Sequence, residues 1–241
     1  MLIIGIVRFG IERNWDVTTF GKVSFSLSIS NFILTFIAAV SIVIFPIIKR
    51  SDADRLPTVY DTLGSLLSGV MLIFLVAYYP IQKILLLWLP HYYEAIQHFA
   101  ILFPISMFEA RTSLLINTSL KALREEKAML FINGFSVLLS LVTTVIVTVL
   151  FKNLTAAVMS IVGLQIVKCL IPDFYLQKKM NMKISFEVLW DALGAIIFIL
   201  GNWFIGGVQG WGMYIVFVVC IGIIRRKEFI NHLKLVKEFI A

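Results

Sequence analysis

Two charged residues, Glu109 and Arg111, lie inside an apolar run of the stretch FPISMFEARTSLLINTSLKALREEKAMLFIN, residues 103–133. Burying either charge at the centre of a lipid bilayer costs about 2.5–3.5 kcal/mol or more. The two residues are two positions apart, so on a helix their side chains point about 200° apart and cannot pair with each other. Each charge therefore needs a partner of its own, a water-filled cavity, or both.

Arg111 has two interpretations at this point. In a hydrated cavity its guanidinium could hold a pyrophosphate through two parallel hydrogen bonds, with Lys168 as a second cation. Alternatively, Glu109 bonds a neighbouring helix, and the two cations pair with Glu109 or with Asp173. Ion coupling through Glu109 is a further hypothesis, and the residue pattern leaves these alternatives open.

The polar residues that follow Arg111 extend the candidate site. Asn117 and Thr118 are candidates for cavity contacts with a substrate, and Lys121 and Arg124 for contacts with its head group at the cytoplasmic mouth. The alternative interpretation is a solvated loop whose basic residues anchor the cytoplasmic end of a membrane span.

Other residue types predict no metal or cofactor site. His91, Glu94 and His98 could share one helix face and bind a metal, but their spacing matches no strong motif. The two cysteines, Cys169 and Cys220, are isolated in apolar runs and are interpreted as packing thiols. A glycine-rich phosphate loop is absent from the sequence, so ATP hydrolysis by this chain is not expected.

The composition identifies the elements that must position these residues. Hydrophobic residues make up 60% of the 241, charged residues make up 15%, and the mean hydropathy is +0.95. Since a soluble domain is about half apolar and a quarter charged, the chain is predicted to be an all-α polytopic membrane protein. The net charge of +7 does not indicate nucleic acid, because the basic residues are dispersed through short loops.

Apolar runs predict about seven membrane spans. They are Ser24–Ile48, Leu63–Tyr79, Ile96–Ile116, Ala128–Phe151, Leu154–Leu176, Phe186–Ile205 and Val208–Ile224. Pro80 is expected to end or kink the second span, and Ile81–Leu89 to form a short interfacial helix. Residues 225–241 alternate apolar and basic positions at helical spacing, which predicts an amphipathic helix on the membrane surface.

The distribution of basic residues predicts the orientation. Segments 49–62, 119–127, 177–185 and 225–241 hold 3, 3, 3 and 5 Lys or Arg residues, or 14 in all. The segments on the opposite side, including the N-terminal one, hold 5. Since short cytoplasmic loops are rich in Lys and Arg, the C-terminus is predicted to lie in the cytoplasm.

Several stretches, taken in order, resemble one family. They are W-x(4)-FGKVSFSLSISNFILTFIAAVSIVIFPIIKR from Trp15, LWLPHYYEA, ILFPISMFEARTSLLINTSLKALREEKAMLFIN and the loop at residues 177–182. Together they resemble bacterial polysaccharide flippases, the O-antigen and capsule repeat-unit transporters of the multidrug/oligosaccharidyl-lipid/polysaccharide exporter superfamily. The resemblance extends from Trp15 to about Lys183 and is strongest around Arg111.

The resemblance implies a two-lobe helical transporter of the bacterial inner membrane. Such proteins move an undecaprenyl-pyrophosphate-linked oligosaccharide between leaflets by alternating access, so the expected chain is not an enzyme. Residues 1–176 would be the second lobe, truncated in its first helix, followed by two additional helices at 177–224 and the tail at 225–241. The first lobe is then expected from upstream sequence or from a separate chain.

Two other readings remain. The chain could be a multidrug or lipid II exporter of the same superfamily. It could instead be a membrane-embedded polysaccharide polymerase or acyltransferase, which would need a sizeable outer loop or a catalytic His/Asp/Arg constellation.

Overall fold

A computed structural model describes residues 2–30, 32, 35, 56–182 and 185–240, and over these residues the chain contains no β-strand. The elements are α1 (Leu2–Asn14), α3 (Leu56–Val76), α4 (Tyr78–Trp88), η1 (Pro90–Tyr92), α5 (Tyr93–Leu102), α6 (Ile105–Arg111), η2 (Thr112–Ile116), α7 (Asn117–Ala122), α8 (Glu126–Val145), η3 (Ile146–Leu150), α9 (Leu154–Lys179), α10 (Glu187–Ile199), η4 (Leu200–Ile205), α11 (Gly207–Ile224) and α12 (Arg226–Ile240). Residues 17–30 are also helical. The segments η2, η3 and η4 are short π-helical stretches that continue the α-helices before them.

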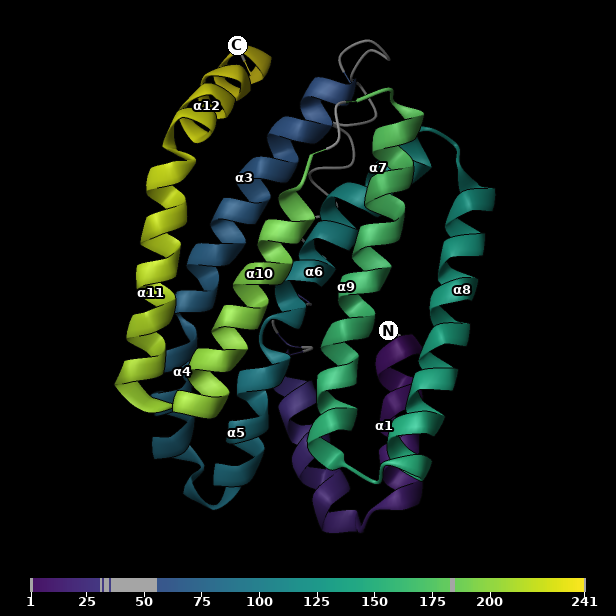
Figure 1. The fold of residues 1–241 in the computed structure, drawn as a ribbon, viewed down its shortest axis with the longest axis vertical. Coiled ribbons are helices and arrows are strands. Elements are labelled where there is room, and N and C mark those ends of the chain that lie inside the picture. The colour runs from purple at the N-terminus through teal and green to yellow at the C-terminus, as the bar shows by residue number, and fades with distance from the viewer. Residues whose placement is uncertain (1, 31, 33–34, 36–55, 183–184, 241) are drawn as a thin grey trace.

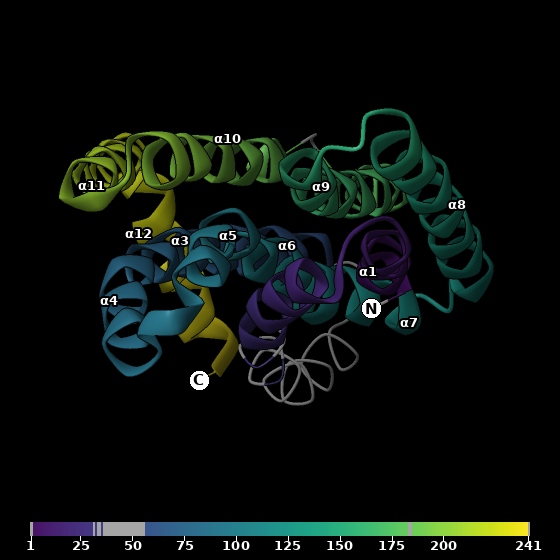
Figure 2. The same cartoon turned by 90° about the horizontal axis from the view of Figure 1, so that it is seen from below.

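The helices form an elongated bundle of two layers (Figure 1). Seen along the long axis, α9, α10 and α11 lie in one row, and α1, α3, α4, α5 and α6 lie in a second row beside it (Figure 2). Helix α8 closes one end of the two rows, next to α9 and α1. The all-α bundle predicted from the sequence is therefore confirmed.

Five of these helices are long and apolar enough to cross a membrane. They are Leu56–Trp88, Glu126–Leu150, Leu154–Lys179, Glu187–Ile205 and Gly207–Ile224. Two further helices, Pro90–Leu102 and Ile105–Ala122, meet at a bend of 41° and make a sixth span if they are counted as one. Seven spans are not confirmed, because the predicted span Ser24–Ile48 lies mostly outside the described residues.

The helix predicted at Ile81–Leu89 is not separate from the second span, since Leu56–Trp88 forms one long helix with a single irregular turn. Pro80 has no N–H to donate to the carbonyl of Val76 one turn earlier. The indole Nε1 of Trp211 on α11 donates to that carbonyl instead, at 2.9 Å. A proline inside a span is tolerated when a neighbouring helix satisfies the freed backbone group in this way.

Two other predicted spans have different outcomes. The span predicted at Ile96–Ile116 is broken, because α5 ends at Leu102 and α6 begins only after Pro104. The predicted tight antiparallel pair at Ala128–Phe151 and Leu154–Leu176 is confirmed by α8, η3 and α9. The side chain of Asn153 caps α9 by accepting a hydrogen bond from the N–H of Ala156 at 3.0 Å.

Helices α10 and α11 pack closely enough to require glycine at their contact. A Cβ atom added at Gly210 would lie 1.9 Å from the carbonyl oxygen of Gly201 in η4. Beside this contact, a group of fully buried aromatic rings joins α4, α5, α10 and α11. Its members are Tyr78, Phe99, Phe198 and Tyr214, together with Phe103 next to the bend.

The helix ends that adjoin the predicted basic segments lie at one end of the bundle. The start of α3, the ends of α7 and α9, and the helix α12 all lie at the upper end of the bundle in Figure 1. The turns between α4 and α5, between η3 and α9, and between η4 and α11 lie at the lower end. This arrangement agrees with the loop assignment on which the predicted orientation rests.

Candidate functional site

Arg111, at the end of α6, is held between carboxylates from two other helices. Its Nη2 lies 3.3 Å from Oδ1 of Asp173 on α9, and its Nη1 lies 3.4 Å from Oδ2 of Asp191 on α10. Nη1 also approaches the carbonyl oxygen of Gly64 on α3 at 3.4 Å. All three charged side chains are 2% exposed. We call this group of three charged residues the Arg111 triad.

Small residues on α3 make room for the guanidinium. A Cβ atom at Gly64 would lie 3.4 Å from Arg111 Nη2 and 3.3 Å from Leu115 Cδ2, so a larger side chain would crowd both. Since α3 also provides Ser65 and Ser68, both of them buried, its contact with α10 is polar over about one turn of helix. The interface of α3 with α10 therefore tolerates charge at a depth where most helix contacts are apolar.

Each carboxylate of the Arg111 triad has further, shorter hydrogen bonds. The hydroxyl of Tyr60 donates to Asp173 Oδ1 at 2.6 Å, and Gln177 Nε2 donates to Asp173 Oδ2 at 2.7 Å. The Ser68 hydroxyl donates to Asp191 Oδ1. By contrast, the contacts of Arg111 are longer than the 2.7–2.9 Å typical of charged pairs, and its Nε has no partner among the described residues. The acceptors are thus better satisfied than the cation.

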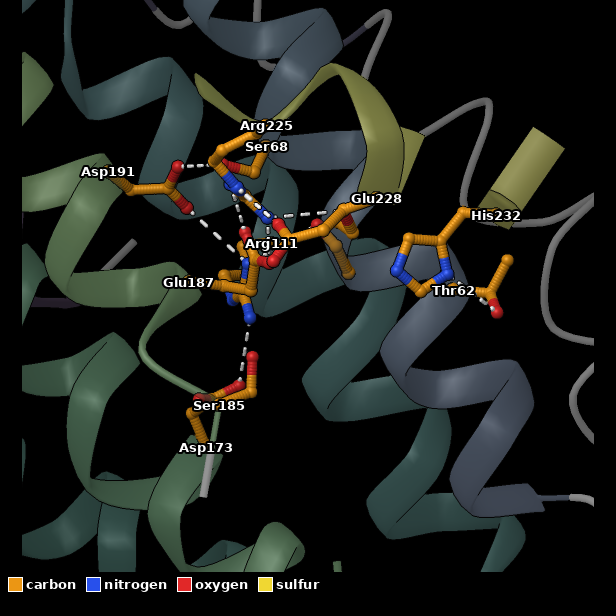
Figure 3. A network of polar contacts seen from close by, with 12 residues as sticks. Thr62, Ser68, Arg111, Asp173, Ser185, Glu187, Asp191, Arg225, Glu228 and His232 are labelled. Carbon is orange, nitrogen blue, oxygen red and sulfur yellow. Dashed lines mark hydrogen bonds and ion pairs between the residues drawn. The ribbon is translucent and has the colours of Figure 1, made fainter. Parts of the chain in front are cut away.

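A second charged group surrounds Arg225 (Figure 3). Arg225, between α11 and α12, forms two hydrogen bonds with Glu187 on α10, one of them at 2.8 Å. It also donates to Glu228 at 3.0 Å and to Ser65 at 3.3 Å. Burial alone would lower the pKa of Arg225, but these carboxylates outweigh that effect and raise it above its ordinary value. Because Glu187 and Asp191 are one turn apart on α10, this group adjoins the Arg111 triad.

A cleft of about 460 Å³ opens beside Arg225. It lies between the start of α3, the segment before α10, and α12; its lining includes Asp61, Thr62, Ser185, Glu187, Glu228 and His232. His232 Nδ1 lies 3.3 Å from the Thr62 hydroxyl, and Ser185 exchanges hydrogen bonds with Gln177, the same residue that bonds Asp173. Polar side chains therefore connect the cleft with the Arg111 triad.

The spacing of Glu109 and Arg111 predicts that their side chains point apart, and in the structure they have different partners. Oε2 of Glu109 accepts a hydrogen bond from Gln165 at 2.6 Å and pairs with Lys168 at 3.4 Å, both on α9. Lys168 is therefore the partner of Glu109 and does not join Arg111 as a second cation. For both cations the structure contains the ion pairs that the alternative interpretation describes.

The remaining candidates are dispersed. Asn117 lines a small cavity of about 10 Å³ together with Lys168, which is close to the space one water molecule needs. The Thr118 hydroxyl donates to carbonyls of its own helix, at Leu114 and Leu115. Lys121 and Arg124 are exposed at the upper end of the bundle and belong to neither charged group.

Beside them, Glu125 links the start of α8 to the end of α9. It pairs with Lys179 at 2.7 Å and accepts a hydrogen bond from Tyr175 at 2.9 Å. These two hydrogen bonds hold the pKa of Glu125 below its ordinary value of 4.5, and the one from Lys179 has the larger effect.

The group considered for a metal does not assemble. Glu94 pairs with Lys22, and His98 bonds the backbone carbonyl of Glu94 and lies beside Trp203. Within the described part of the chain, no three His, Cys, Asp or Glu side chains converge. Cys169 is buried, as expected of a packing thiol, whereas Cys220 is exposed.

The sequence interpretation passed over Asp191, Glu187, Tyr60 and Arg225. Asp191 carried the same signal as Glu109, a carboxylate inside a predicted span, and could have been found by it. Tyr60 had no such signal, since a tyrosine near the end of a span is common at the membrane interface.

Comparison of the chain with protein-family models, with curated proteins and with solved structures found no match.

Proposed function

We propose that this chain belongs to a membrane transporter that moves an undecaprenyl-pyrophosphate-linked oligosaccharide across the bacterial inner membrane, by alternating access and without covalent chemistry, for surface polysaccharide synthesis. The observation that carries the proposal is the Arg111 triad. A guanidinium buried among membrane-spanning helices has a large free-energy cost, so such a residue is by default a candidate for a functional site, substrate pathways among them. The sequence resemblance supplies the substrate class.

The unequal contacts of the triad support a role for Arg111 in binding an anion. Both carboxylates accept shorter hydrogen bonds, Asp173 from Tyr60 and Gln177 and Asp191 from Ser68, in addition to their contacts with Arg111. The guanidinium has the longer contacts of the triad, and its unpaired Nε is a donor that an anion could use. A pyrophosphate would replace both carboxylates as a bidentate partner.

The polar contact between α3 and α10 supports alternating access. The cleft beside Arg225 and the Arg111 triad are connected by Ser65, Ser68 and Glu187, so water entering the cleft would meet hydrogen-bonding groups along that interface. Two helices with a polar interface separate and hydrate at lower cost than helices with an apolar one. In this proposal the cleft is the cytoplasmic mouth, and the basic upper end of the bundle faces the cytoplasm.

The test is complementation of a strain that lacks its own polysaccharide flippase, using the chain together with any lobe encoded beside it. Arg111→Ala should lower surface polysaccharide at least tenfold. Arg111→Lys, which keeps the charge but loses the planar fork, should also lower it clearly. Arg13→Lys is the matched control, because Arg13 is exposed on α1. Protein abundance in the membrane is measured for every variant.

Unchanged surface polysaccharide in an abundant Arg111→Lys variant would refute the role of Arg111. Failure of the wild type to restore polysaccharide would refute the proposed substrate. In that case, transport of lipid II or of a cationic drug by reconstituted vesicles would indicate the other exporters of the superfamily, and covalent lengthening or acylation of the glycan would indicate a membrane enzyme.

A further inference from the structure

A second cleft, of about 330 Å³, lies at the turns between α4 and α5 and between η4 and α11, which are at the end of the bundle opposite α12 in Figure 1. It is open between α4, α5 and the turn that joins η4 to α11. Its polar and aromatic lining consists of Tyr78, Gln82, Tyr93, Gln97, Asn202 and Trp203. The other lining residues are one isoleucine and two glycines, so every side chain in the lining is uncharged. The volume falls in the range usual for small-molecule sites.

Tyr78 gives this cleft an unused hydrogen-bonding group. The side chain is 1% exposed, and its ring is enclosed by Phe99, Phe103 and Phe198 at centroid distances of 5.8, 5.6 and 5.2 Å. Its hydroxyl has no partner among the described residues. Since buried hydroxyls are nearly always paired, a phenol held rigidly in this way indicates an unfilled position for a ligand or an ordered water molecule.

Amide groups line the same cleft. Asn202 donates through Nδ2 to the carbonyl of Phe198 at 3.0 Å, which leaves its own carbonyl oxygen as an acceptor. Gln97 donates to the Tyr93 hydroxyl at 3.1 Å, which likewise leaves its Oε1 as an acceptor. Amide and phenol groups of one lining therefore provide both donors and acceptors.

The start of α11 adds backbone donors. Gly206 and Gly207 line the cleft with φ values of +72° and +59°, a conformation that favours glycine. No side chain in the described structure caps α11 at Gly206. The first N–H groups of a helix have no partner within it, so they are available beside the cleft.

We propose that this cleft binds a neutral saccharide unit. A sugar presents hydroxyls that both donate and accept, which suits the tyrosine and amide groups, and an apolar C–H face, which suits the ring of Trp203. A phosphate would find no cation in this lining. The inference rests on the proposed function in one respect: the natural ligand would be a sugar of the lipid-linked oligosaccharide, bound near the non-cytoplasmic end.

The test is saturation-transfer difference NMR on the wild-type chain in nanodiscs. The probes are three neutral trisaccharides, composed of glucose, of galactose and of N-acetylglucosamine. At least one is expected to bind with millimolar affinity, and Tyr78→Phe should weaken it about three- to tenfold, the effect of losing one hydrogen bond. Tyr79→Phe is the matched control, since Tyr79 stacks on Trp211 and lies outside the cleft lining. It should bind as the wild type does.

Absence of binding by all three trisaccharides would overturn the inference, as would equal binding by the Tyr78→Phe variant. The ring of Tyr78 is unchanged in that variant, so a folding defect is not expected to mimic the loss. The binding assay does not depend on transport. If the chain binds saccharide at Tyr78 but never restores surface polysaccharide, the inference about the cleft is supported and the proposed function is refuted. If the chain restores surface polysaccharide but binds no saccharide, the proposed function is supported and the inference about the cleft is refuted.

Discussion

Replacement of Arg111 by methionine should destabilise the bundle strongly, because it leaves two buried carboxylates without their shared cation. At 3.3–3.4 Å and an effective dielectric constant of 20, each pair contributes a gross attraction of about 5 kcal/mol. Desolvation offsets most of that attraction, but breaking a buried pair from one side costs about 3–5 kcal/mol. We expect Arg111→Met to lower the free energy of unfolding by that amount.

Asp191→Asn should have a much smaller effect. With both carboxylates ionised, one guanidinium faces two negative charges, so the Arg111 triad carries a net charge of −1. The asparagine variant brings this charge to zero, and its carbonyl oxygen still accepts the hydrogen bond from Ser68. A cost of about 1 kcal/mol or less is expected. The double variant should be at least about 2 kcal/mol more stable than Arg111→Met alone, because only one unpaired carboxylate remains.

The assay is equilibrium unfolding of the purified chain in mixed micelles of a mild detergent and dodecyl sulfate, followed by tryptophan fluorescence. Arg13→Met is the control for loss of an exposed arginine. If Arg111→Met unfolds at the same detergent fraction as the wild type, the triad does not stabilise the bundle. If Asp191→Asn costs as much as Arg111→Met, the reasoning from net charge is refuted.

Three further predictions concern packing and pH. Gly210→Ala should destabilise the chain by about 1–3 kcal/mol or more in the same unfolding assay, because its Cβ would collide with the carbonyl of Gly201. Trp211→Phe should cost about 1–3 kcal/mol, since the carbonyl of Val76 loses its donor. The pKa of Glu125 is lowered in the folded state, so its stabilising contribution is present above about pH 4.5 and is lost as the pH falls through the lowered value. Glu125→Gln should therefore flatten the acid side of the stability–pH curve.

Matched variants separate these effects from general damage. Gly134→Ala introduces a Cβ with no atom within 4 Å on the same kind of helix, so it should leave stability unchanged or raise it slightly. Trp190→Phe changes a tryptophan that is 38% exposed on α10 and should cost little. Equal losses in a test variant and its matched control would contradict the assigned contact. If the acid side of the stability–pH curve is unchanged in Glu125→Gln, the pair of Glu125 with Lys179 does not contribute to the pH dependence of stability.

The amino-acid sequence could predict the need for the Arg111 triad but not its full membership. Helical geometry alone showed that Glu109 and Arg111 must have separate partners, and Asp173 was recognised as one possible partner. That Asp191 is the second partner depends on how α10 packs against α3, because Arg111 and Asp191 are 80 positions apart in the sequence. Hydrophobic periodicity carries no information about which helices become neighbours.

The same limit applies to backbone partners. Pro80 correctly marked a disturbance in its helix, yet the local sequence predicted that the span would end or kink there. The continuation depends on an indole N–H that comes from Trp211, 135 residues from Val76. Local propensity is overridden when a distant side chain satisfies the carbonyl that proline leaves open.

The order of the Arg111 triad along the chain has a consequence for its insertion into the membrane. Arg111 precedes Asp173 by 62 residues and Asp191 by 80. At about 5–20 residues per second of synthesis, the guanidinium waits roughly 3–16 s before the carboxylates leave the ribosome. During that interval the broken segment at Pro104 holds an uncompensated charge and is a poor candidate for release into lipid. We therefore expect stable insertion of this segment to follow the synthesis of α9 and α10.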